Sequence, residues 1–93
     1  MDNKNILKIA KECLQYIKTG RVFVTGDIEI GEKFAALLNE KIKTQTYHIH
    51  YYRIHYVDGK PALMFGFSDK KEKVINALEK FIKEREKWVK KDF

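Results

Sequence analysis

The side chains best suited to chemistry lie between Thr44 and Phe67. This stretch reads TQTYHIHYYRIHYVDGKPALMFGF, and it holds all three histidines of the chain together with Arg53. Imidazole, guanidinium and phenol groups donate hydrogen bonds to phosphate oxygens, and histidine and tyrosine rings stack on unpaired bases. These residue types favour contact with an anion or a nucleic acid, and they suit DNA and RNA alike.

The strand predicted within residues 47–57 does not alternate cleanly between polar and apolar side chains. With a strict period of two, both of its faces are mixed, which is unusual for a strand that covers a core. A β-bulge near Tyr51 and Tyr52 would correct the alternation. We therefore predict a bulge there and, on one face, a polar stripe of His48, His50, Arg53 and His55 that Arg21 and Lys60 extend. An unbroken ladder across residues 51–53 would exclude the bulge.

A metal site is the catalytic alternative for the same stretch. The sequence His48-Ile49-His50 directs two imidazoles to the same side of a strand, as two metal ligands require. This pair resembles the one that replication-initiator and relaxase endonucleases use to hold a divalent metal on a central strand, with a helical tyrosine as nucleophile. The resemblance covers three residues and implies a metal-dependent nuclease. No tyrosine follows Tyr56, however, so the last helix supplies no nucleophile.

Other enzyme classes leave no signature in the chain. The sequence has no glycine-rich phosphate loop, no Gly-Lys-Ser and no serine or cysteine triad signature. Its single cysteine, Cys13, lies in a helical apolar pattern that is typical of a small buried hydrophobe. We therefore expect a non-enzymatic protein without a cofactor or metal. A lone reduced cysteine favours a cytoplasmic location.

Size and charge narrow the class of protein further. The chain has 93 residues, of which 44% are hydrophobic and 34% charged, and this fits one folded, soluble domain spanning residues 1–93. No apolar run approaches the ~18 residues that a membrane span needs. The formal net charge of +6 is compatible with a polyanionic partner. Many of the basic residues lie between Lys70 and Lys91 and alternate with acids, which is typical of a solvated helix face.

Hydrophobic periodicity predicts the elements that must position these residues. Apolar residues three and four apart predict a helix over residues 3–19, which Gly20 should end. Residues 21–25 predict a short strand. We favour a turn after it and a helix from about residue 31 to 43, with a cap at Asp27 as the alternative start.

The second half of the chain predicts a hairpin followed by a long helix. Asp58 and Gly59 suit a tight turn, and Pro61 suits the start of the second hairpin strand. Neither face of residues 61–67 is strongly polar, so we expect this strand to be the central one. A last helix should begin near Ser68 or Asp69, where Asp69 and Glu72 have capping-box spacing.

Together these elements predict an α+β fold in the order α-β-α-β-β-α. We expect a two-layer sandwich in which helices cover one face of a three-stranded, mainly antiparallel sheet. The proposed function is nucleic-acid binding, or binding of a nucleic-acid-associated partner, through the sheet face of the 45–67 hairpin. The alternative is a homodimeric protein-interaction module, or an inhibitory or regulatory subunit. With either function we expect a dimer. Trp88, Val89 and Phe93, at the end of the last helix, are the candidate self-association surface, and the alternative is that Trp88 folds back on the N-terminal helix.

Overall fold

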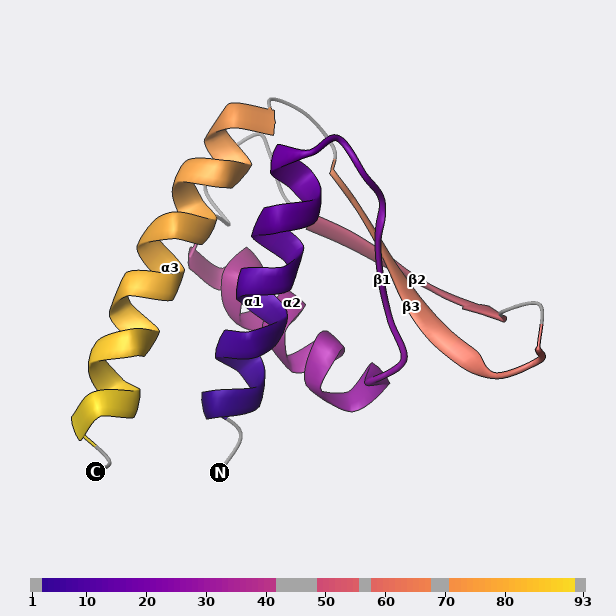
Figure 1. Ribbon diagram of the computed structural model, residues 1–93, viewed down its shortest axis with the longest axis horizontal. Helices are drawn as coiled ribbons and strands as arrows, with labels where there is room; N and C mark the ends of the chain where they lie inside the picture. Colours follow the sequence, from indigo (N-terminus) through magenta and orange to yellow (C-terminus); the bar gives the residue numbers. More distant parts are fainter. Residues whose placement is uncertain (1–2, 42–48, 56–57, 68–70, 92–93) are drawn as a thin grey trace.

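Three helices and three strands form the described part of the computed structural model, which covers residues 3–41, 49–55, 58–67 and 71–91 (Figure 1). At positions 41, 49–52, 55, 67, 71 and 88–91 the backbone alone is described. In chain order the elements are α1 (Asn3–Lys18), β1 (Phe23–Thr25), α2 (Ile28–Lys41), β2 (Ile49–His55), β3 (Pro61–Phe67) and α3 (Lys71–Lys91). The predicted order α-β-α-β-β-α is confirmed.

Helix α1 ends at the glycine that the sequence predicted as its stop. Gly20 has a φ of 73°, a left-handed conformation that glycine adopts without steric cost. Its N–H donates to the carbonyl of Ile17 at 3.0 Å, and the Arg21 N–H donates to the carbonyl of Tyr16 at 2.8 Å. This pair of bonds is the Schellman motif, which satisfies carbonyls that the helix leaves without partners.

Helix α2 begins at Ile28, so the start that we favoured near residue 31 is wrong. The reason is the aspartate before it. The Asp27 Oδ1 atom accepts a hydrogen bond from the Ile30 N–H at 3.2 Å, and the Asp27 carbonyl accepts from the Gly31 N–H at 2.9 Å. Such a cap stabilises a helix by about 1 kcal/mol. The alternative start, with Asp27 as the cap, is therefore confirmed.

The sheet has the strand order β1-β3-β2, and both neighbouring pairs are antiparallel. Strand β3 is therefore the central strand, as its apolar composition predicted. The turn between β2 and β3 also follows the prediction, because Gly59 has a φ of 82° and the Asp58 Oδ1 accepts a hydrogen bond from the Lys60 N–H at 3.1 Å. Pro61 begins β3, as expected.

The predicted bulge in β2 is wrong. Each residue from Ile49 to His55 has one partner on β3, in an unbroken register from Phe67 back to Pro61. The mixed alternation has another explanation, because β2 is an edge strand. Arg53 lies on the same face as buried Leu63, but at the margin of the sheet its side chain is 69% exposed and reaches solvent. A polar residue on the covered face is tolerated where it can leave the core.

A chain of aromatic rings connects the helices to the sheet. The ring centroids of Phe23 in β1 and Phe65 in β3 are 5.3 Å apart, and Phe34 in α2 lies 5.9 Å from Phe65. Phe81 in α3 lies 5.8 Å from Phe34, and Tyr16 in α1 lies 5.4 Å from Phe23. These separations are typical of favourable aromatic pairs. One core therefore holds α1, α2 and α3 to the two strands.

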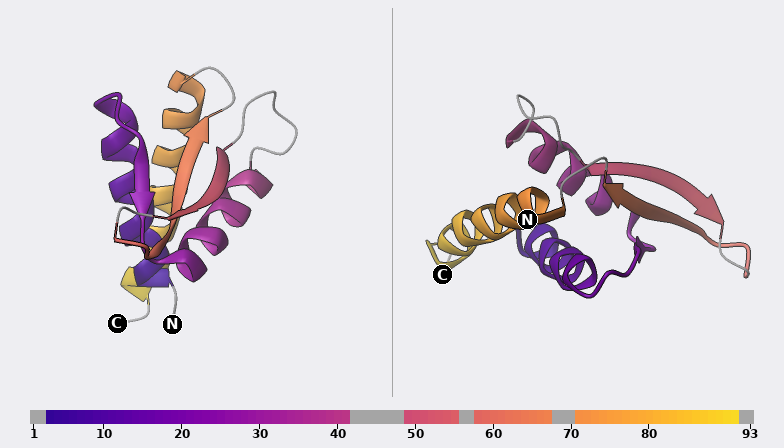
Figure 2. Two further views of the ribbon diagram at one scale, coloured as in Figure 1. Left: turned by 90° about the vertical axis from the view of Figure 1, so that its right-hand side faces the viewer. Right: turned by 90° about the horizontal axis from the view of Figure 1, so that it is seen from above.

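The helices lie on one side of the sheet, as both views in Figure 2 show. Phe23 and Phe65 are paired across β1 and β3, face the helices and are 1% exposed. The next pair, Val24 and Met64, lies on the opposite face and is partly exposed. The predicted two-layer sandwich, with helices on one face, is confirmed.

Helix α3 packs beside α1 in the opposite direction, so that its carboxyl end lies near the amino end of α1 (Figure 1). The described part of α3 begins at Lys71, and the predicted cap at Asp69 lies outside the described residues. Trp88 and Val89 are described as helical backbone, and Phe93 lies outside the described part, so their role in self-association stays a prediction. No helix in the described ranges combines the length and apolar character that crossing a membrane requires.

Gly31 allows α2 to approach the sheet closely. A Cβ atom at this position would lie 2.9 Å from the Cδ1 atom of Leu63 and 3.3 Å from the Cγ2 atom of Thr25. Leu63 is fully buried, so its side chain has little room to withdraw. By contrast, a Cβ atom at Gly66 in β3 would meet no atom within 4 Å.

We predict that Gly31→Ala destabilises the protein by about 1 kcal/mol, because overpacking costs ~1–3 kcal/mol and the gain in helix propensity is only ~1 kcal/mol. Gly66→Ala is the matched control. It should be neutral or slightly stabilising, because glycine in a strand loses more conformational entropy on folding than alanine does. Urea unfolding followed by circular dichroism measures both changes. A higher urea midpoint for Gly31→Ala than for the wild type would contradict the close approach.

Candidate functional site

The polar stripe predicted on the 45–67 hairpin is not assembled by the described residues. Because the β2 register is unbroken, strand positions 50 and 53 lie on opposite faces of the sheet. Positions 53 and 55 share a face, but it is the face that the helices cover. His48 lies outside the described residues, and His50 and His55 are described by their backbone alone. Arg53 is therefore separated from His50, contrary to the predicted stripe.

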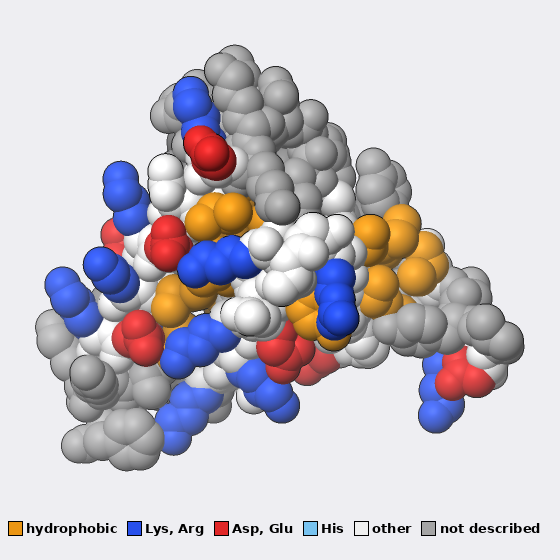
Figure 3. All heavy atoms as spheres, turned by 45° about the horizontal axis from the view of Figure 1, so that its top comes forward, with side chains coloured by type: hydrophobic (Ala, Val, Ile, Leu, Met, Phe, Trp, Pro, Cys, Tyr) orange, Lys and Arg blue, Asp and Glu red, His pale blue; other side chains and the backbone are white. Residues whose placement is uncertain are grey.

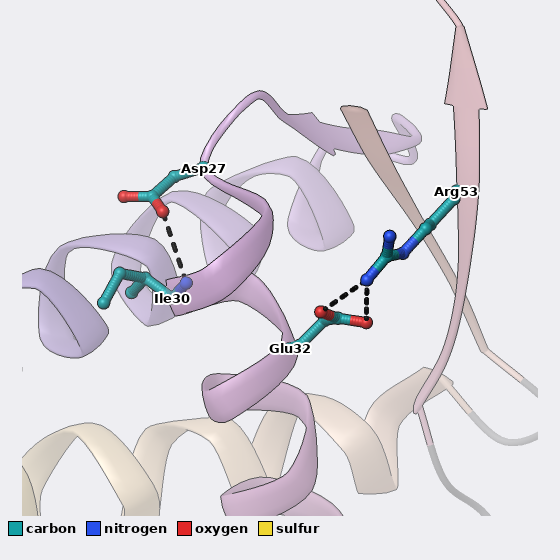
Figure 4. A network of polar contacts seen from close by, with 4 residues as sticks. All are labelled: Asp27, Ile30, Glu32 and Arg53. Carbon is teal, nitrogen blue, oxygen red and sulfur yellow. Dashed lines mark hydrogen bonds and ion pairs between the residues drawn. The ribbon is translucent and has the colours of Figure 1, made fainter. Parts of the chain in front are cut away.

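Arg53 is held by a carboxylate from α2 (Figure 4). Its Nη2 atom lies 3.1 Å from Oε1 and 3.3 Å from Oε2 of Glu32. The contact is possible because Arg53 is paired with Leu63, which packs against Gly31, the neighbour of Glu32 in the helix. Arg53 thus has an internal anion, and a phosphate would have to compete with it.

Arg21 and Lys60 do not extend a common surface. Arg21 precedes β1, whose Phe23 pairs with Phe65 near the carboxyl end of β3, whereas Lys60 directly precedes the start of β3. Seven residues of β3 separate the two ends, which is about 23 Å at ~3.3 Å per residue. Both side chains are exposed, but they do not converge.

The sheet face without helices is apolar in its described part. Val22 is 59% exposed, and Val24, Ile54 and Met64 are partly exposed. Gly66, which is partly exposed, and Ala62, which is fully buried, lie on the same face of β3 as Met64. We call these six residues the uncovered face. Figure 3 shows hydrophobic side chains at the surface on the sheet end of the molecule. None of the six side chains carries a charge. The register also places strand positions 50 and 52 on this side of the sheet, and their side chains lie outside the described part.

Ion pairs between α1 and α3 neutralise part of the charge on the helices. The Lys11 Nζ lies 3.3 Å from Oε2 of Glu86, and the Lys18 Nζ lies 3.5 Å from Oε2 of Glu79. Each of these four side chains is roughly half exposed, so the pairs contribute little to stability. Their effect on the charge distribution is larger, because they turn two carboxylates of α3 toward α1.

A buried arginine reinforces the same helix pair. Arg85 is 9% exposed, and its Nη1 atom donates to Oδ1 of Asn3 at 3.1 Å. Its Cζ atom lies 5.1 Å from the centre of the Phe81 ring, within range of a cation–π interaction. Arg85 is therefore a structural cation that fixes α3 against α1, and it is not available to a surface ligand.

The outward surface of α3 carries a row of lysines. At 100° per residue, positions 76, 80, 83 and 87 fall within an arc of about 60° on the side opposite buried Val74 and Leu78. We call Asn76, Lys80, Lys83 and Lys87 the lysine face. All four are exposed, and within the described part of the chain none of the three lysines has a carboxylate partner. Figure 3 shows Lys and Arg side chains gathered over the helical side of the molecule.

An open hollow of about 330 Å³ adjoins the lysine face. The described residues that line it are Asn76, Glu79, Lys80 and Lys83. Glu79 is paired with Lys18, so the hollow presents two unpaired ammonium groups and one amide. Ammonium and amide N–H groups donate hydrogen bonds to phosphate oxygens. Of the surfaces described, this one has the chemistry of an anion contact.

Neither a metal centre nor an activated thiol emerges from the described residues. Among the described side chains, no three His, Cys, Asp or Glu residues are grouped to hold a metal ion. The His48/His50 alternative lies outside that search and stays a prediction, although β2 is an edge strand and the motif that it resembles occupies a central one. Cys13 is fully buried, and burial raises the pKa of its thiol to about 12. A protonated thiol is a poor nucleophile at neutral pH.

The lysine face was missed because the alternating acids and bases of the last helix were read as a self-compensating surface. A helical projection of residues 72–87 carries the signal, since the lysines at 80, 83 and 87 fall on one side. Which acids pair with which lysines is not readable in the same way. That pairing depends on α1, which is more than 50 residues away in the chain.

We predict that the Arg53–Glu32 pair contributes less than about 1 kcal/mol to stability, because the arginine side chain is mostly exposed. A double-mutant cycle with Arg53→Gln and Glu32→Gln, measured by urea unfolding, gives the coupling energy. A small favourable coupling supports Arg53 on the helix-covered face. Zero coupling, together with loss of anion binding in Arg53→Gln, would restore it to the predicted stripe.

Comparison with known proteins supplies no relative for this chain. No protein-family model matches it, and neither a curated protein nor a solved structure is significantly similar to it. The surfaces themselves must therefore indicate the function. They offer unpaired ammonium groups on α3 and an uncharged apolar face on the sheet.

Proposed function

We propose that the protein binds nucleic acid through the lysine face of α3, with no catalytic step. The observation that carries the proposal is a set of three exposed lysines on one side of a helix, none of which has a carboxylate partner among the described residues. The hollow supports it, because Asn76, Lys80 and Lys83 line it together with Glu79, whose carboxylate is paired with Lys18. The formal net charge of +6 also makes the electrostatic potential around the protein positive at long range, which attracts a polyanion.

The physical basis is release of counterions from the phosphate backbone. Each phosphate that a lysine neutralises frees condensed cations, so affinity depends steeply on salt. The helix holds the three ammonium groups on a rigid axis, with Lys80 and Lys87 about 10 Å apart along it. Lysine is a compact charge on a flexible stem, so each ammonium group can adjust locally to a phosphate while the helix sets the spacing between the stems.

This proposal moves the contact away from the sheet. The predicted sheet contact used Arg53 and Lys60 of the hairpin and Arg21 before β1, but Arg53 is paired with Glu32 and the other two lie near opposite ends of β3. These three cations would therefore contact a phosphate backbone at widely separated positions. The lysine face presents its charges together, and this difference provides a direct test.

We predict that the affinity for a fluorescein-labelled oligonucleotide falls about 40-fold between 50 mM and 200 mM salt, as expected for three phosphate contacts with a slope of about −2.7. Fluorescence anisotropy at several salt concentrations measures it. The triple variant Lys80→Gln, Lys83→Gln, Lys87→Gln should lose most of the binding and most of the slope, since each lysine accounts for a slope of about 1.

The matched control removes equal charge from the hairpin side, with Arg21→Gln, Arg53→Gln and Lys60→Gln. All six side chains are exposed, so both triple variants should fold as the wild type does, which circular dichroism verifies. The proposal requires the control to retain binding within about threefold, the size of a general charge effect. Equal losses in both variants, or no binding at 50 mM salt, would contradict it.

Self-association through the uncovered face is a second candidate function. The chain is strongly basic, so a second copy can approach most easily where no like charges meet, and the six described residues of this face carry none. Its area is small, because two strands of seven residues and one of three, at ~3.3 Å per residue and ~4.8 Å between strands, give roughly 270 Å². A standard interface needs about 800 Å² per partner. We therefore propose a weak homodimer, formed in the cytoplasm where Cys13 stays reduced.

We predict a concentration-dependent mass in light scattering, rising from 11.1 kDa toward twice that value at high protein concentration. Val22→Glu should keep the protein monomeric, because it buries a charge in the contact. Thr19→Glu is the control, since it adds the same charge at an exposed position outside the uncovered face. A monomer at every concentration, or equal dimerisation of both variants, would rule out this surface.

A further inference from the structure

We infer that the partner of the lysine face is duplex DNA, bound through its phosphates and without sequence preference. The inference rests on the proposed nucleic-acid binding and adds the form of the nucleic acid. It depends on the side chains that the face lacks, on the width of the helix pair and on the spacing of the lysines.

The lysine face has no ring on which a base could stack. Its members are an asparagine and three lysines, and the described residues that flank it on α3 are charged. Phe81 is 2% exposed on the opposite side of the helix, and Trp88 occupies the helix position two turns after it. Proteins that bind single strands combine a basic surface with aromatic stacking platforms, which are worth ~1–3 kcal/mol per base. The lysine face offers the charge without the platform.

The α1–α3 pair is too wide to enter a groove and read bases. The two helices lie side by side, joined at the surface by the Lys11–Glu86 and Lys18–Glu79 pairs. Two packed helices span roughly 20 Å, from an axis separation of ~8–10 Å and a diameter of ~10–12 Å. The major groove of DNA is about 12 Å wide, so it admits one helix and excludes this pair. The face must therefore lie across the phosphates that border the groove.

The lysine spacing matches those phosphates. Lys80 and Lys87 lie about 10 Å apart along the axis of α3, and their flexible stems extend the reach. Two phosphate rows separated by a groove of about 12 Å are a fixed feature of duplex DNA. A single strand offers no such second row, and the deep, narrow major groove of duplex RNA brings its rows closer together. Bridging by Lys80 and Lys87 therefore favours duplex DNA.

The test compares four probes of about 20 nucleotides or base pairs, titrated by anisotropy between 50 mM and 200 mM salt. They are an A·T-rich duplex DNA, a G·C-rich duplex DNA, one of the corresponding single strands and a duplex RNA. We expect both DNA duplexes to bind within about threefold of each other, because phosphate contacts carry no sequence information. We expect them to bind at least about fivefold more tightly than the single strand and the RNA, which lack the second phosphate row.

Single-lysine variants separate bridging from general attraction. Lys80→Gln and Lys87→Gln should each reduce the preference for duplex over single-stranded DNA, whereas Lys83→Gln, which lies between them, should lower affinity and keep the preference. Equal or tighter binding of the single strand or of RNA, or a tenfold difference between the DNA sequences, would overturn the inference while leaving nucleic-acid binding intact. Absence of binding to all four probes would instead overturn the proposed function.

Discussion

A continuous series of aromatic ring contacts holds the three helices against the sheet. Tyr16, Phe23, Phe65, Phe34 and Phe81 come one each from α1, β1, β3, α2 and α3, and consecutive rings lie 5.3 to 5.9 Å apart. Because each ring has a neighbour on another element, no helix can rotate or slide without breaking an aromatic pair. This series fixes which face of the sheet is covered. It also fixes the side of α3 that turns inward, and so the side that its lysines present to solvent.

The fixed register of the sheet decides what the hairpin can do. Strand β2 is an edge strand, and its unbroken pairing with β3 places Arg53 beside Leu63 on the helix-covered face. There Gly31 brings α2 so close that Glu32 meets the guanidinium. The hairpin thus uses its cation within the fold. The opposite face has uncharged side chains in its described part.

Charge on the helices is distributed by their antiparallel packing. Lys11 and Lys18 of α1 take up Glu86 and Glu79 of α3, and buried Arg85 is occupied by Asn3 and the Phe81 ring. The contribution of these exposed ion pairs to stability is small. They do draw two of the four glutamates of α3 toward α1. The helix is basic in composition, and Lys80, Lys83 and Lys87 lie on its exposed side.

The sequence by itself determined the elements and their order, because these follow from local signals. Hydrophobic periodicity marks the helices, Gly20 and Gly59 supply positive φ, and the apolar faces of residues 61–67 mark the central strand. The tertiary structure alone decided the site. A bulge and an unbroken ladder are equally compatible with the residues of β2, since register is set by pairing with a partner strand. The pairing of Glu79 and Glu86 in α3 likewise depends on α1, which is distant in the chain and reaches these acids only after folding.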